Sequence, residues 1–179
     1  MDAIPTTYKG ITFRSRNEAR WAAFFDLLKW QWEYEPFDLK GYIPDFVIRF
    51  KHYPLLIEVK HETDFKALES HDALDKIARS GWDKEALIVG AALFEERYTS
   101  DKRACLGVLA QFMAGESVVT SGGDLIFCSH CNTNSVNSDI QSFHCRNCGF
   151  NDGGNHASAV SNARTLWGEA QSIVQWKPK

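Results

Sequence analysis

The pattern of apolar and polar positions predicts one helix and three strands in the first third of the chain. Ser15 and Glu18 have the spacing of a helix capping box, and apolar residues recur behind them at helical spacing, which predicts a buried amphipathic helix over 16–29. Three short segments rich in aromatic and β-branched residues follow, separated by turn-forming residues. We expect these segments to be consecutive strands over 32–35, 42–50 and 55–60.

The rest of the pattern predicts further helices around one buried strand. Residues 65–79 have apolar positions at helical spacing, and the continuous apolar run over 86–93 is typical of a buried, parallel strand. Helical spacing also predicts helices over 101–114 and 155–174. The run SGGD from Ser121 to Asp124 predicts a linker.

Composition and charge limit the kinds of protein this chain can be. Of its 179 residues, 44% are hydrophobic and 24% are charged, which excludes a mainly disordered chain. The formal net charge of −3 argues against binding nucleic acid through an overall positive charge, so any such contact has to be local. The sequence has no secretion signal and no apolar run of membrane-spanning length, so we expect a cytoplasmic protein without a membrane partner.

Two predicted neighbouring strands carry two carboxylates and a lysine. Asp45 follows a proline at the start of one strand, and Glu58 and Lys60 alternate with apolar residues on the next, so they project from one face. If the strands pair, the three side chains converge. Two carboxylates suit Mg²⁺, and the lysine can lie beside an attacking water. The arrangement predicts hydrolysis of phosphodiester bonds.

At these residues the sequence resembles the PD-(D/E)XK nuclease superfamily. The superfamily has a helix with Glu, a strand with Pro-Asp, a strand with Glu-x-Lys, a helix and a strand, and the resemblance covers about Tyr8 to Leu93. The chain is also similar to uncharacterised phage and bacterial members. The resemblance implies a restriction-endonuclease-like fold.

The resemblance also implies roles for individual residues. Asp45 and Glu58 would bind Mg²⁺ or Mn²⁺ together with the backbone carbonyl of Val59. Lys60 would orient the attacking water and offset charge in the transition state, and Glu18 would complete the metal site or hold a metal-bound water.

Purely structural roles for the same residues stay open. Glu18 can serve its capping box alone, Asp45 can be a turn residue, and Glu58 and Lys60 can form an exposed ion pair. The apolar neighbours of Asp45 and Glu58 weigh against this, because charges in such strands are costly without a partner.

The leading function is a Mg²⁺-dependent DNA endonuclease that processes phage or mobile-element DNA in a bacterial or phage-infected cell. Its partners would be DNA and a second copy or a targeting protein. One alternative is a catalytically silent nuclease fold that binds nucleic acid or protein, such as a phage factor that blocks a host system. Another is the cutting subunit of a transposition complex. The presence of all four residues favours the enzyme: Glu18, Asp45, Glu58 and Lys60.

Basic and aromatic residues near the first helix are candidates for contact with DNA. Four cations cluster around the start of this helix, where a small patch can grip the DNA backbone, or they form a solvated face with ion pairs. Trp30 and Trp32 can stack on bases or pack in the core. The four cations are Lys9, Arg14, Arg16 and Arg20.

Four of the five cysteines form two C-x-x-C pairs, separated by thirteen residues. Four thiolates complete a tetrahedral Zn²⁺ site and leave no open position, so the segment resembles a structural zinc ribbon. His130 and His144 are alternative ligands, and Cys105 is expected to be a buried apolar residue in a helix. The pairs are Cys128 with Cys131 and Cys145 with Cys148.

The polar residues of the ribbon contact DNA or a partner, or the ribbon is only a structural clip. These residues are Asn132, Asn134, Asn137, Gln141, Arg146 and Asn147.

Together the elements indicate an α/β fold with a mixed central sheet flanked by helices, in the order α-β-β-β-α-β, and a small zinc ribbon with four cysteine ligands. We expect the nuclease core over 1–120, the ribbon over 124–152, and a C-terminal helix over 153–179 that packs back on the core.

Overall fold

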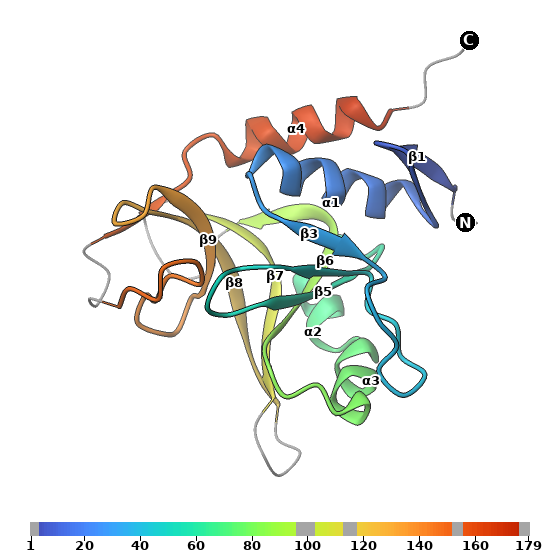
Figure 1. Cartoon of the computed structure of the whole chain (residues 1–179), viewed down its shortest axis with the longest axis horizontal. Helices are drawn as coiled ribbons and strands as arrows, with labels where there is room; N and C mark the ends of the chain where they lie inside the picture. The colour runs from blue at the N-terminus through green and yellow to red at the C-terminus, as the bar shows by residue number, and fades with distance from the viewer. Residues whose placement is uncertain (1–3, 96–102, 113–117, 152–155, 176–179) are drawn as a thin grey trace.

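A curled mixed sheet carries helices on both of its faces in the computed structural model (Figure 1). The structure describes residues 4–95, 103–112, 118–151 and 156–175. Within this part of the chain, no helix is long and apolar enough to cross a membrane. The helices are α1 (Arg16–Leu27), α2 (Phe65–Glu69), α3 (Ala73–Ser80) and α4 (Ala163–Ile173).

The strands form one small hairpin and one large sheet. The hairpin of β1 (Thr6–Tyr8) and β2 (Ile11–Phe13) precedes α1 and was not predicted. The large sheet contains β3 (Trp32–Tyr34), β4 (Phe46–Ile48), β5 (Leu55–Val59), β6 (Ala86–Glu95), β7 (Ala104–Phe112), β8 (Val118–Cys128), β9 (Thr133–Ser138) and β10 (Ala157–Ala159).

The chain enters the large sheet through an antiparallel meander of β3, β4 and β5. It then crosses over through α2 and α3 and returns in β6, parallel to β5. The strands β6, β7, β8 and β9 continue as antiparallel neighbours, and β10 also pairs with β8. The predicted α-β-β-β-α-β order is therefore present, with α2 and α3 in the place of the second helix.

Alternation along β5 divides the core into two clusters. Leu55 and Ile57 belong to the cluster beneath α1 and α4, whereas Leu56 belongs to the cluster beneath α2 and α3. Glu58 lies two residues after Leu56, so its side chain projects from the same face of the sheet, toward α2 and α3. The two helical layers therefore fix which face the candidate site uses.

The helix predicted over 101–114 is wrong, because the described part of this segment is strand β7. Seven successive residues of β7 are buried, so both faces are covered and the sequence lacks a two-residue period that would identify a strand. Gly107 is the residue that could have indicated a strand, because glycine within a strand marks a close approach of another backbone. A Cβ at this position would clash with the carbonyl oxygen of Ile88 on the neighbouring strand. Residues 101, 102, 113 and 114 lie outside the described ranges.

The linker predicted from Ser121 to Asp124 lies inside strand β8. Its glycines permit close packing rather than a turn, since a Cβ on Gly123 would come within 2.5 Å of Leu87 Cδ1. Strand β8 therefore runs without interruption from the predicted core into the first cysteine pair.

Two other predicted helices are shorter than expected. The helix over 65–79 is divided into α2 and α3, and the segment that was to begin the last helix contains β10. Residue 155, the expected first residue of that helix, lies outside the described ranges. Helix α4 packs on α1, where the ring centroids of Trp167 and Trp21 lie 4.5 Å apart.

Candidate functional site

Asp45 and Glu58 meet at one end of the β4–β5 pair. The register that pairs Phe46 with Ile57 brings Asp45 opposite Glu58 when it is continued by one residue. The backbone N–H of Val59 donates to Asp45 Oδ2 at 2.7 Å, which holds this carboxylate against β5. Both carboxylates are buried, with Asp45 4% and Glu58 8% exposed.

Glu58 is hydrogen-bonded by two side chains. Lys60 Nζ lies 2.7 Å from Glu58 Oε1, so the lysine and the carboxylate share one face of β5 as their alternation predicts. The hydroxyl of Tyr42 donates to Glu58 Oε2 at 2.6 Å. The side chain of Glu58 is 10% exposed and that of Lys60 is 21% exposed. The two residues therefore do not form the solvent-exposed ion pair that a purely structural role would give.

Glu18 reaches the same region from α1 while also taking part in the helix cap. Its backbone N–H donates to Ser15 Oγ at 3.1 Å, and the Ser15 hydroxyl donates to Glu18 Oε1 at 2.8 Å. The second carboxylate oxygen accepts a 2.6 Å hydrogen bond from the Tyr34 hydroxyl. Capping and a place in the site are therefore compatible for this residue.

The guanidinium of Arg14 connects the carboxylates. It forms an ion pair with Asp45, and its Nε lies 3.0 Å from Glu35 Oε1 and 3.9 Å from Glu18 Oε2. The Arg14 side chain is 59% exposed, so it covers the site from the solvent side. Arg14 was predicted as a DNA contact, and in this structure its partners are the site's own acids.

Burial and like charges raise the pKa of Asp45 to about 7, with Glu58 as the main neighbouring charge and Glu18 as a further one. Burial and the charge of Glu58 also raise the pKa of Tyr42, which stays a hydrogen-bond donor. Burial and the hydrogen bond to Glu18 raise the pKa of Tyr34 to about 12. The site therefore has more buried negative charge than its own cations offset.

Hard oxygen ligands and unrelieved negative charge suit a divalent cation at Asp45 and Glu58. Among the described residues, the carboxylates of Glu18, Asp45 and Glu58 do not form a group whose ligand atoms all lie within 4.8 Å of one another, so the three do not make a compact site of three ligands.

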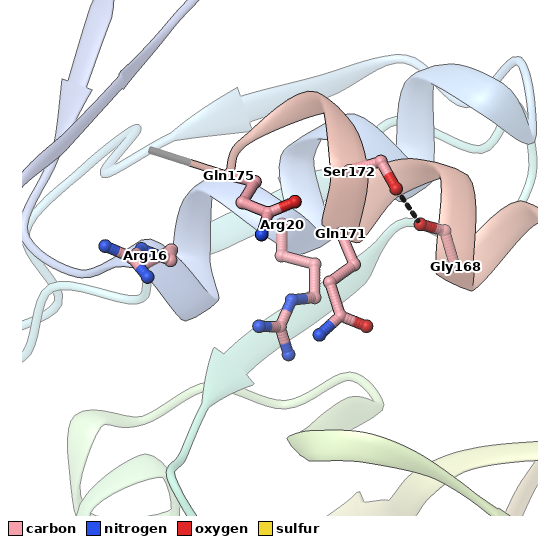
Figure 2. Close-up of a pocket in the computed structure, with 6 residues that line it drawn as sticks. All are labelled: Arg16, Arg20, Gly168, Gln171, Ser172 and Gln175. Carbon is pink, nitrogen blue, oxygen red and sulfur yellow. Dashed lines mark hydrogen bonds between the residues drawn. The ribbon is translucent and has the colours of Figure 1, made fainter. Parts of the chain in front are cut away.

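The four predicted DNA-binding cations have separate surroundings. Lys9 pairs with Asp26 at 2.8 Å, and Arg14 belongs to the carboxylate cluster. Arg16 and Arg20 line a groove of about 220 Å³ between α1 and α4 (Figure 2). The other residues that line this groove are Gly168, Gln171, Ser172 and Gln175.

The Arg20 side chain already has partners within the chain at that groove. Its Nη1 donates to the carbonyl of Ala91 at 3.1 Å, and its guanidinium lies 5.5 Å from the ring centroid of Trp167. In Figure 2 the side chains of Arg20 and Gln171 extend from α1 and α4 on the same side. The groove is lined by two cations, amides and a hydroxyl, which are groups that bind phosphate.

The four predicted cysteines come together at the end of β8. Their sulfur atoms all lie within 4.8 Å of one another, with 4.0 Å from Cys128 to Cys148 and 3.6 Å from Cys131 to Cys145. Four sulfurs arranged tetrahedrally at zinc–sulfur distances of about 2.3 Å lie about 3.8 Å apart. The group could therefore hold a structural metal ion and is consistent with zinc.

The alternative histidine ligands have other contacts. His130 stacks on Phe150 with 4.0 Å between ring centroids, and the His144 ring lies 5.4 Å from that of Tyr53. Neither belongs to the cysteine group. Burial raises the pKa of the Cys148 thiol to about 12, whereas at Cys131 burial is outweighed by hydrogen bonds from Thr133 and the other thiols, which lower its pKa to about 7.

Arg146 is not available to DNA, which corrects the prediction for this residue. It is fully buried, its Nε donates to the carbonyl of Val136 at 2.9 Å, and its Nη1 pairs with Glu85. Its own carbonyl accepts the backbone N–H of His52 at 3.0 Å. Arg146 therefore fastens the cysteine segment to the sheet. Asn137 is buried too, at 3% exposed.

Other predicted residues fill the core. Trp30 is 6% exposed, and its ring N–H donates to the carbonyl of Asn134 at 2.9 Å. Trp32 is partly buried and packs on Phe46. Cys105 is buried, although in strand β7 rather than in a helix, and burial raises the pKa of its thiol to about 12.

Sequence reasoning missed the tyrosines of the carboxylate site. Tyr34 and Tyr42 come from the β3 end and from the loop before β4, and each donates to a carboxylate sixteen residues away in sequence. Their proximity to the predicted acids along the chain is the only available signal, because hydrogen bonds between elements follow from the strand pairing.

A comparison with known protein families, curated proteins and solved structures found no match to this chain. The function is therefore inferred from the two clusters themselves.

Proposed function

We propose that the chain is a Mg²⁺-dependent DNA endonuclease of the PD-(D/E)XK type with a structural zinc ribbon. The observation that carries the proposal is the pairing of two buried carboxylates across β4 and β5, with Lys60 on Glu58. Support also comes from the order of elements, because an antiparallel meander is followed by a crossover into a parallel strand. This order and sheet arrangement support a restriction-endonuclease-like core.

Asp45 and Glu58, with the carbonyl of Val59, would hold the Mg²⁺ or Mn²⁺ ion. When bound, such an ion supplies Lewis-acid polarisation of the scissile phosphate and stabilises developing negative charge. The raised pKa of Asp45 favours this role, since a cation offsets the repulsion between the two carboxylates.

The cationic side chains would act on the water and the phosphate. Lys60 is held at the strand end by its backbone N–H, which donates to the Val89 carbonyl at 2.8 Å, and its ammonium would orient the attacking water. Tyr42 fixes the orientation of Glu58. Arg14 would release Asp45 when a cation binds and then contact a phosphate oxygen, because its side chain is largely exposed.

A second candidate is a catalytically silent nuclease fold that binds nucleic acid or protein. A specific observation favours it: each carboxylate already has a partner within the chain. Arg14 pairs with Asp45, Lys60 and Tyr42 bind Glu58, and Tyr34 binds Glu18. Such pairing stabilises the acids without a metal.

Cleavage assays separate the two candidates. Purified protein is incubated with supercoiled, linear, single-stranded and four-way-junction DNA, with Mg²⁺, with Mn²⁺ and with neither. We expect metal-dependent cleavage of at least one substrate by the wild type and none by Asp45→Asn. Lys60→Met should lower turnover more than Mg²⁺ affinity, since the ammonium acts on the water.

Zinc content and circular dichroism establish that each variant is folded. Cleavage by Asp45→Asn at the wild-type rate would overturn the enzyme proposal. A lack of metal-dependent cleavage on every substrate by a folded, zinc-loaded wild type would favour the silent fold.

A further inference from the structure

A second and larger cleft lies where the end of α1, the end of β4 and the cysteine segment meet. Its volume is about 470 Å³, which falls within the range of small-molecule binding sites. The floor is apolar, formed in part by Trp30 and Phe50, which are 6% and 8% exposed. Asn134 also lines the cleft, and its carbonyl accepts the Trp30 ring N–H, so floor and wall are fixed to each other.

The rim of this cleft is cationic. Lys29, Arg49 and Lys51 line it, and no acidic residue does. Arg49 is bound by Glu33 through two 2.8 Å hydrogen bonds, so its charge is largely offset. Lys29 and Lys51 are exposed and form no ion pair within the described ranges. Two unneutralised ammonium groups at the mouth of a cleft favour an anionic ligand.

The walls carry side-chain amides from both sides of the cleft. Gln31 comes from the turn between α1 and β3, whereas Asn132, Asn134 and Asn147 come from the cysteine segment. Each amide both donates and accepts hydrogen bonds, which suits the mixed edge of a nucleobase. Cations, amides and an apolar floor correspond to the phosphate, the base edge and the base face of a nucleotide.

Backbone conformation supplies an independent observation. Lys29 and Asn132 both have positive φ, at 62° and 55°, and both line this cleft. Lys29 directly follows the C-cap of α1, a position at which glycine is preferred because a Cβ is strained there. Asparagine adopts this conformation readily, so the strain lies at Lys29. The lysine contributes an ammonium at the rim that glycine would not.

We infer that this cleft binds a nucleotide whose base is unpaired. The base would lie over the apolar floor against the amides, with its phosphate at Lys29 and Lys51. A base within a duplex cannot enter such a concave site, so the substrate has to offer a single-stranded or flipped nucleotide. The inference rests on the proposed function in that it names the substrate class of the nuclease, and it is tested by binding alone.

The test uses fluorescence anisotropy of a labelled single-stranded oligonucleotide, without Mg²⁺, on the full wild-type chain and its variants. Lys29→Gly removes one ammonium and relieves one positive φ. Lys40→Gly is the matched control, because Lys40 is exposed, has a φ of 53° and lies beside Gly81 rather than at the cleft. Both variants should keep or raise the thermal stability of the wild type.

Of the two glycine variants, only Lys29→Gly should weaken binding, and it should reduce the salt dependence of the binding constant by about one counterion. Asn147→Ala, with its zinc content verified, should weaken binding and alter the preference among homopolymers. Equal affinity of Lys29→Gly and wild type overturns the inference, as does equal loss with Lys40→Gly. A duplex of the same length that binds as tightly as the single strand also overturns it.

A mononucleotide competitor distinguishes the sources of the ligand. Competition by thymidine monophosphate at concentrations near those of the oligonucleotide would identify a free nucleotide as the occupant. Competition by the oligonucleotide alone would identify a strand segment.

The controls also separate this inference from the proposed enzyme. Asp45→Asn should lose cleavage, and Lys29→Gly should weaken oligonucleotide binding by the same factor in the Asp45→Asn background as in the wild type. If the wild type cleaves no substrate but Lys29→Gly weakens binding, the cleft inference stands and the enzyme proposal is overturned. If Asp45→Asn abolishes cleavage but Lys29→Gly leaves binding unchanged, the enzyme proposal stands and the cleft inference is overturned.

Discussion

The carboxylate cluster and the cysteine cluster differ in how their charges are balanced. The acids come from α1, the start of β4 and β5, and cationic or hydroxyl side chains of the same chain already contact them. The cysteines come from one segment of twenty-one residues, and their side-chain hydrogen bonds join them to one another and to Thr133. The first cluster can therefore persist without a metal, whereas the second is a group that could hold one.

The largest expected effect comes from removing two ligands of the cysteine cluster. Cys145→Ser with Cys148→Ser should abolish zinc binding and unfold β9 and the end of β8, because metal binding supplies folding energy to a segment of this size. Elemental analysis should give one zinc per chain in the wild type and none in the variant. Hydrogen exchange should show loss of protection there, while Mg²⁺ binding at Asp45 and Glu58 persists.

Cys105→Ala is the control for that variant, because Cys105 is buried in β7 outside the cluster. It should keep the zinc. Zinc in the double serine variant at the wild-type level would contradict the assignment, and so would its absence from wild type.

Arg146→Met should give the next largest effect, a loss of about 3 to 5 kcal/mol in the free energy of unfolding, because it leaves the carboxylate of Glu85 without its charged partner. The interaction lowers the pKa of Glu85 against the opposing effect of burial. Urea denaturation with Arg79→Met as control measures this. The Arg79 and Asp75 pair is exposed, so that change should cost less than about 1 kcal/mol. Similar costs for the two variants would contradict the role of Arg146.

Asp45→Asn should have a smaller, pH-dependent effect on stability. The pKa of Asp45 is about 7 in the folded protein and about 4 when unfolded, so its ionisation costs increasing stability as the pH rises through this interval. The variant, measured without Mg²⁺, should therefore gain about 2 kcal/mol relative to wild type between about pH 5.5 and about pH 8.

Exposed Asp83 provides the control for this comparison, since Asp83→Asn should show no such trend. A gain for Asp45→Asn that shrinks as the pH rises would contradict the raised pKa.

Arg14→Ala should have the smallest effect. It removes an internal cation that competes with Mg²⁺ for Asp45, so the affinity for Mg²⁺ should rise, by up to about fivefold if the half-exposed pair contributes up to about 1 kcal/mol. Calorimetric titration with Mg²⁺ measures the change. A lower Mg²⁺ affinity in the variant would show that Arg14 orders the site rather than competing for it.

Local pattern was enough to predict helix α1 and the meander of β3, β4 and β5, although not the β1–β2 hairpin. The capping box located α1, and aromatic and β-branched segments located β3, β4 and β5. Alternation correctly put Glu58 and Lys60 on one face, and spacing alone identified the four cysteines. These features depend on residues that are close in sequence.

The features that were missed depend on neighbours distant in sequence. A helix was predicted in place of β7 because a strand buried on both faces has no polar period. The contact of Arg14 with Asp45 spans 31 residues, and that of Arg146 with Glu85 spans 61. No local pattern encodes such partners, because strand pairing and sheet closure bring them together.

The separation of Arg146 from Glu85 has a consequence for the order in which the protein folds. Glu85 directly precedes β6, the parallel neighbour of β5, yet the residue that neutralises it is synthesised 61 residues later. The β3–β4–β5 meander contains mainly local contacts and can form early, while β6 gains its charge partner only after the cysteine segment has docked. The partly buried carboxylate of Glu85 therefore gains its charged partner only once that segment has docked on the sheet.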